Sequence, residues 1–104
     1  MEESPFACDM SAIPEAERDV HFTTIKQLFQ SVETVEELSN GYRFRLSGES
    51  DVLALTAEFI SRERLCCPFF AFGLEVEAEK GAVWLSLTGR EGVKPFILAE
   101  IGSV

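Results

Sequence analysis

Two hairpin patterns, each followed by a helical pattern, constrain the fold of this chain more than any other feature. In the first hairpin, residues 34–38 and 42–46 flank Asn40-Gly41, a strong signal for a two-residue turn, and the second arm alternates between apolar and polar residues. In the second hairpin, residues 74–79 and 83–88 alternate in the same way on either side of Lys80-Gly81. Both segments therefore predict pairs of antiparallel strands.

Apolar residues at helical spacing predict three helices. The first is expected to begin near Pro14 and to run to about residue 31. The second is expected from about Asp51 and should stop at Cys67, because Pro68 disfavours helical geometry in the residue before it. The third spans roughly residues 91–101, and residues 1–12 are expected to form an irregular N-terminal arm.

These elements predict a single α+β domain over residues 1–104. An N-terminal helix would be followed by two ββα units that form one four-stranded antiparallel sheet with the helices on one face. The strand residues expected in the core beneath the helices are Phe44, Leu46, Leu74, Val76, Val83, Leu85 and Leu87. Glu75 and Glu77 should be exposed on the opposite face, near Arg43 and Arg45, where opposite charges can pair across strands.

The charge balance excludes some partners. Eighteen Asp and Glu residues against nine Lys and Arg residues give a net charge of −9, which repels nucleic acid phosphates and anionic membrane surfaces. No stretch approaches the roughly 18 apolar residues of a membrane span, and Met1 to Pro5 lacks the features of a signal peptide. We therefore expect a cytoplasmic protein, with its thiols reduced.

The adjacent Cys66 and Cys67, with Cys8 as the third cysteine, are the most informative residues for function. Neighbouring Cα atoms lie about 3.8 Å apart, less than the roughly 4.4–6.8 Å of ordinary disulfides, so a bond between Cys66 and Cys67 is not expected. Cys8 could pair with either of them, which would leave one thiol over. As thiolates, the three cysteines would suit a soft metal ion such as zinc, or a trivalent metalloid.

Two other interpretations of the cysteines remain open. Free cysteine behaves as a small hydrophobic residue, so the pair could fill the core of a structural or interaction module beside Phe69, Phe70 and Phe72. Such a module could form a homodimer through the open sheet around Trp84. A thiol redox protein is the third interpretation, although the C-terminal end of a helix disfavours a thiolate. The sequence assigns no enzymatic reaction.

Three further features favour ordinary structural roles. The charged run Arg62-Glu63-Arg64 is expected to be a solvated helix surface. His21, the single histidine, is more often a surface or core residue than a metal ligand. The segment Leu87 to Gly92 resembles a turn that could hold an anion, but two glycines without a lysine make a weak signal, and loop geometry explains them better.

Three blocks of the sequence resemble a family of small, largely uncharacterised bacterial proteins. The blocks are Ala7-Cys8-Asp9-Met10, residues 62–69 with the sequence RERLCCPF, and residues 85–94. With the expected elements, the resemblance covers nearly the whole chain, and the Cys-Cys-Pro-Phe block is its most specific part. The family has a loose link to heavy-metal resistance. The resemblance therefore implies that the cysteines, Cys8 included, are important.

A site that joins the three cysteines makes a geometric prediction. The N-terminal arm must fold back over the end of the second helix, with Phe6 anchored against Phe69 or Phe70. Three sulfur atoms that each bind zinc at about 2.3 Å would lie within roughly 4 Å of one another.

Overall fold

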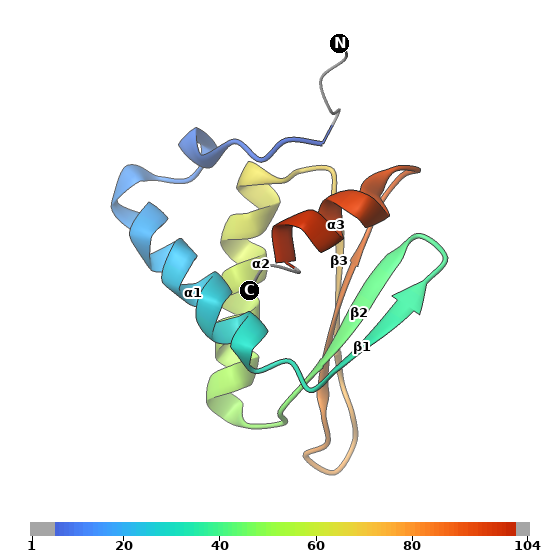
Figure 1. The fold of residues 1–104 in the computed structure, drawn as a ribbon. Helices are drawn as coiled ribbons and strands as arrows, with labels where there is room; N and C mark the ends of the chain where they lie inside the picture. The colour runs from blue at the N-terminus through green and yellow to red at the C-terminus, as the bar shows by residue number, and fades with distance from the viewer. Residues whose placement is uncertain (1–5, 102–104) are drawn as a thin grey trace.

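The computed structural model describes residues 6–101, which form an antiparallel sheet of four strands with three α-helices on one face (Figure 1). The predicted α+β class and antiparallel sheet are confirmed. The elements are α1 (Arg18–Gln30), β1 (Thr34–Leu38), β2 (Gly41–Leu46), α2 (Ser50–Cys66), β3 (Ala71–Val76), β4 (Val83–Thr88) and α3 (Val93–Ile101). Met1 to Pro5 of the predicted arm lie outside the described residues.

The centre of the sheet carries the core. Strands β2 and β4 pair in the middle, and β1 and β3 form the edges. The register places Phe44 opposite Leu85 and Leu46 opposite Val83. These four side chains and Leu87 are buried, because α2 and α3 pack over β2 and β4. The prediction for these five core residues is confirmed.

The prediction that Leu74 and Val76 are buried is wrong. They are 43 % and 51 % exposed. They lie opposite Leu85 and Val83 in the register, so they share the helix-facing side of the sheet. Their strand, β3, is at the edge, and the helices cover the central strands. Alternation identifies the face on which a residue lies but not whether another layer covers that face.

The face of the sheet away from the helices is polar, and Trp84 is covered there. The Arg43 guanidinium lies 4.0 Å from the centre of the Trp84 ring and 3.7 Å from the Glu75 carboxylate. Trp84 is therefore only 9 % exposed, so little of it is available to a partner. Glu75 and Glu77 are exposed as predicted. Arg45 lies beside Glu33 rather than a glutamate of β3.

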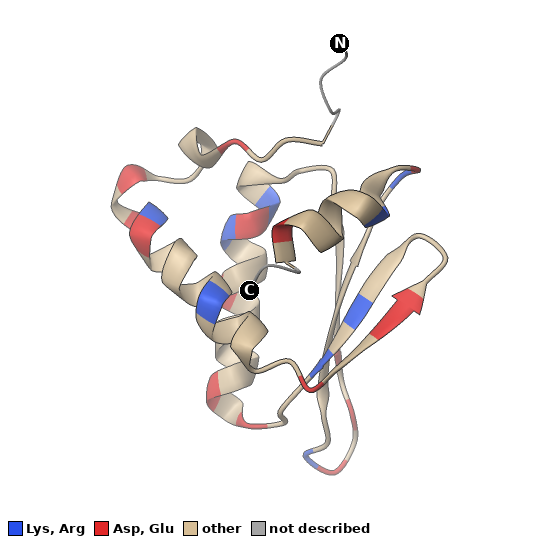
Figure 2. Ribbon diagram, in the orientation of Figure 1, with Lys and Arg blue, Asp and Glu red and all other residues tan. Residues whose placement is uncertain are grey.

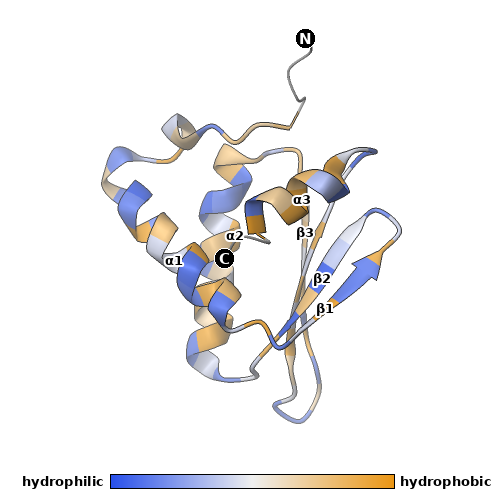
Figure 3. Ribbon diagram, in the orientation of Figure 1, coloured by the Kyte–Doolittle hydropathy of each residue, from blue (hydrophilic) through white to orange (hydrophobic). Residues whose placement is uncertain are grey.

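Helices α1 and α3 begin later than the sequence predicts, whereas α2 begins at Ser50, close to the predicted Asp51. Pro14 is extended, and two 3-10 turns, Met10–Ala12 and Glu15–Glu17, precede α1. Gly92 has a φ of 95°, a conformation that ends the preceding loop and delays the start of α3 to Val93. Helix α3 is the most hydrophobic of the three helices (Figure 3). Helix α2 ends at Cys66, and Cys67 has left helical geometry with φ −127° and ψ 67°, as Pro68 predicts.

The N-terminal arm is docked by apolar contacts. Phe6 is buried, and its ring centre lies 5.2 Å from that of Phe69 and 6.0 Å from that of Phe96. Ile13 is fully buried. The predicted contact of Phe6 with Phe69 is confirmed. The arm therefore packs against both the segment after α2 and helix α3.

Candidate metal and thiol site

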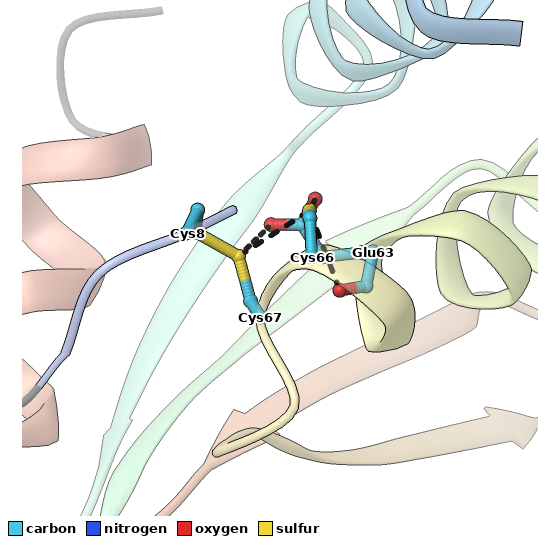
Figure 4. A group of neighbouring side chains, drawn as sticks. All are labelled: Cys8, Glu63, Cys66 and Cys67. Carbon is cyan, nitrogen blue, oxygen red and sulfur yellow. Dashed lines mark hydrogen bonds between the residues drawn. A yellow bond between two sulfur atoms is a disulfide. The ribbon is translucent and has the colours of Figure 1, made fainter. Parts of the chain in front are cut away.

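The three cysteines meet where the arm crosses the C-terminal end of α2 (Figure 4). The backbone N–H of Asp9 donates to the carbonyl oxygen of Cys66 at 2.8 Å. This bond satisfies a carbonyl that has no partner within the helix and fixes the neighbouring Cys8 above the end of α2. The predicted fold-back of the arm is confirmed.

Cys8 and Cys67 form a disulfide, and their Cα atoms lie 4.7 Å apart, within the ordinary range. Cys66 is a free, buried thiol, and its sulfur lies 3.6 Å from that of Cys67. The disulfide therefore leaves Cys66 as the one unpaired cysteine, and it does not join the adjacent Cys66 and Cys67, as the sequence predicts. Its presence differs from the expectation that all three thiols are reduced.

A fourth residue, Glu63, completes the cluster. One ligand atom from each of Cys8, Glu63, Cys66 and Cys67 can be chosen so that all four lie within 4.8 Å of one another. This spread is slightly wider than the roughly 4 Å expected for sulfurs around one zinc ion. The structure therefore brings the three predicted residues together, but the disulfide occupies two of the three sulfurs.

Glu63 is buried among polar and sulfur atoms, at 7 % exposure. Its Oε1 lies 2.8 Å from Nε2 of His21 and 3.5 Å from Sγ of Cys66. Its Oε2 lies 3.5 Å from Sγ of Cys67. The Cys66 thiol can donate to the carboxylate. The disulfide sulfur of Cys67 has no hydrogen to donate, so that contact is a close approach of an oxygen to the disulfide.

The prediction that Arg62-Glu63-Arg64 is a solvated surface is wrong for Glu63. Figure 2 shows acidic and basic residues together near the C-terminal end of α2. Arg64 is exposed, and Arg62 donates to Glu17 at 3.1 Å. Glu63 instead shares the buried side of the helix with Phe59 and Cys66. That helical spacing was the sequence signal for the inward position of Glu63, although the charge run favours a surface.

His21 contacts the Glu63 carboxylate from helix α1. It is fully buried on α1, and its ring stacks on Phe59 with the centres 6.0 Å apart. Its Nε2 faces Glu63, whereas its Nδ1 is buried without a hydrogen-bond partner among the described residues. If Nε2 carries the proton, it donates to Glu63 and the unpartnered Nδ1 is an acceptor. His21 is thus a buried partner of the cluster, although it does not join the group of ligand atoms.

The site disfavours additional negative charge. Burial, and then the neighbouring Glu63, raise the pKa of Cys66 from 9.0 to about 12, so this thiol is protonated at neutral pH. Burial and Glu63 also raise the pKa of Glu100. Among the described residues, no lysine or arginine forms a salt bridge with Glu63, and Nε2 of His21 is its close nitrogen contact. The cluster therefore combines sulfur and carboxylate ligands with little compensating positive charge.

The chain matches no protein-family model, curated protein sequence or solved structure. Within residues 6–101, no helix has the length and apolar character needed to cross a membrane.

Proposed function

We propose that the protein binds one soft metal or metalloid ion through the thiolates of Cys8, Cys66 and Cys67, in a state in which the disulfide is reduced. Zinc is one candidate, and other thiophilic ions suit the same donors. The resemblance of the Cys-Cys-Pro-Phe block to a family linked to heavy-metal resistance agrees with this proposal. The family itself stays a prediction, as do a cytoplasmic location, a homodimer and the absence of a nucleic acid partner.

The observation that carries the proposal is the burial of Glu63 against two sulfur atoms. A buried carboxylate is unfavourable unless a positive charge or several hydrogen bonds compensate it. His21 supplies one polar partner. A bound cation would supply the missing positive charge, and Glu63 could contribute an oxygen ligand or a hydrogen-bond acceptor beside the sulfurs.

Disulfide formation and ion binding exclude each other. The sulfurs of Cys8 and Cys67 cannot be thiolate ligands while they are bonded to one another. Two electrons and two protons convert the disulfide to two thiols. A divalent ion then displaces the thiol protons as it binds. In a reducing compartment the ion-binding state is accessible, whereas oxidation closes the site and releases the ion.

The alternative function is a structural or redox disulfide without a metal. Two observations favour it: the disulfide itself, and the near-complete burial of Cys66 and Cys67, at 1 % and 0 % exposure. A disulfide that only fastens the arm has no need of a buried carboxylate or of Cys66. The two functions therefore differ in whether the reduced protein binds an ion, and in whether Cys66 and Glu63 contribute to that binding.

A cadmium(II) titration of the fully reduced protein separates these functions, since cadmium–thiolate bonds absorb in the ultraviolet. We expect binding of one ion per chain. Each of the variants Cys8→Ser, Cys66→Ser and Cys67→Ser should weaken binding at least about tenfold. Glu63→Gln should also weaken it, whereas the matched change Glu58→Gln, at an exposed residue of the same helix, should not. Reduced protein that takes up no cadmium would overturn the proposal.

A further inference from the structure

The two ends of the disulfide differ in their access to solvent. Cys67 is fully buried at the end of α2. Cys8 is only half-buried, on an arm whose neighbouring residues Ala7 and Asp9 are exposed. A molecule that approaches from solvent therefore meets the sulfur of Cys8 before that of Cys67.

The geometry of disulfide exchange also favours attack on Cys8 over attack on Cys67. A thiolate attacks one sulfur in line with the bond and displaces the other sulfur. For an attack on Cys67, the reagent must come from the side opposite Cys8. That side holds Cys66 and Glu63, whose atoms lie 3.6 and 3.5 Å from the Cys67 sulfur (Figure 4). Both are buried, so this approach is closed to an external thiol.

We propose that Cys8 is a site of S-thiolation, at which a low-molecular-weight monothiol opens the disulfide. The monothiol loses its proton and its sulfur bonds to Cys8, while the Cys8–Cys67 bond breaks. Cys67 leaves with the electron pair and takes up a proton. A second monothiol then attacks the mixed disulfide, which gives free Cys8 and the oxidised dimer of the reagent. Two monothiols thus supply the two electrons.

Cys66 has a separate part in this reaction, as a donor to the leaving sulfur. Its thiol lies 3.6 Å from Cys67 and can donate a hydrogen bond as negative charge develops there. Attack by Cys66 itself is disfavoured, because it would close a strained ring between adjacent residues. The inference extends the proposed function by identifying the reductant class and the sulfur that it reaches, but the S-thiolation step requires no metal.

The test treats the oxidised, metal-free protein with about one equivalent of 2-mercaptoethanol in native buffer, followed by acid quenching and alkylation with N-ethylmaleimide. Peptide mass spectrometry then locates both groups. We expect the mercaptoethanol adduct on Cys8 and maleimide on Cys67, in addition to maleimide on Cys66, which is a free thiol before the reaction. An adduct mainly on Cys67 or Cys66, or a reaction that occurs only in denaturant, would overturn the inference.

A pair of variants tests the part of Cys66. Cys66→Ser keeps a hydrogen-bond donor and Cys66→Ala removes it, and we expect opening to be about fivefold slower in the alanine variant than in the serine variant. Equal rates would remove Cys66 from the reaction. These experiments contain no metal, so the adduct on Cys8 can be found even if cadmium does not bind, and cadmium can bind even if the adduct lies elsewhere.

Discussion

Reduction of the Cys8–Cys67 disulfide should lower the free energy of unfolding by up to about 4 kcal/mol. The bond joins residues that are 59 positions apart. A cross-link of this span lowers the entropy of the unfolded chain by about 14 cal/mol/K in the chain-entropy description, which is about 4 kcal/mol at room temperature. Because the bond spans more than half of the chain, it restricts the unfolded state strongly.

The folded state should keep the arm in place after reduction. Phe6 and Ile13 remain buried by apolar contacts, and the Asp9 N–H still donates to the carbonyl of Cys66. Because these contacts do not depend on the disulfide, the main effect of reduction falls on the unfolded chain. Loss of the arm from the folded state would reveal itself as a separate, earlier change in the exposure of Phe6.

Urea unfolding, followed by the fluorescence of the single tryptophan, Trp84, measures this effect. With a chelator present, the reduced protein should unfold at about 2 M lower urea than the oxidised protein, if the slope is about 2 kcal/mol per molar. The control variant Cys8→Ser should show no dependence on reductant. Equal midpoints for the oxidised and reduced wild-type protein would refute this reasoning.

Three further results are expected. Leu85→Ala should lower the free energy of unfolding by about 2–5 kcal/mol, whereas Leu74→Ala, at the uncovered sheet edge, should lower it by less than about 1 kcal/mol; equal effects in urea unfolding would contradict the observed burial. Phe6→Ala should destabilise the protein and speed reduction of the disulfide by a monothiol, because Phe6 docks the arm that carries Cys8; an unchanged reduction rate would argue against this role. The folded protein keeps the Cys66 proton up to about pH 12, whereas the unfolded chain loses it near pH 9.0. The contribution of this proton to the free energy of unfolding should therefore be full below pH 9.0 and fall above it, by at most about 1.4 kcal/mol per pH unit. In unfolding experiments at different pH values, Cys66→Ala should lack this part of the decline.

The sequence predicted the sheet well because alternation and turn residues are local signals. The pairing of Phe44 with Leu85 at the centre of the sheet follows from two hairpins that share one apolar face. The exposure of Leu74 and Val76 could not be predicted in the same way. It depends on where three helices lie over four strands, and strand periodicity contains no information about that placement.

The candidate site was predictable in part. Pro68 predicted the end of α2, and the apolar Phe6 near Cys8 predicted that the arm would dock there. The burial of Glu63 was missed because its arginine neighbours favoured a solvated surface, although its helical spacing from Phe59 and Cys66 places it on the buried side of α2. Its contact with His21 joins residues 42 positions apart, and such a pair is determined by the packing of α1 on α2. The choice of Cys67 over Cys66 as the partner of Cys8 likewise depends on the backbone turn at Cys67.

Native mass spectrometry with zinc, on reduced and on oxidised protein at neutral pH, tests the central claim most directly. The reduced chain should gain one zinc ion and lose the protons of the thiols that bind it. The oxidised chain, with Cys8 and Cys67 bonded, should bind none, and addition of a reductant to the same sample should restore binding. Zinc-free spectra for the reduced chain, or equal zinc uptake by both forms, would contradict a site made from these three sulfurs.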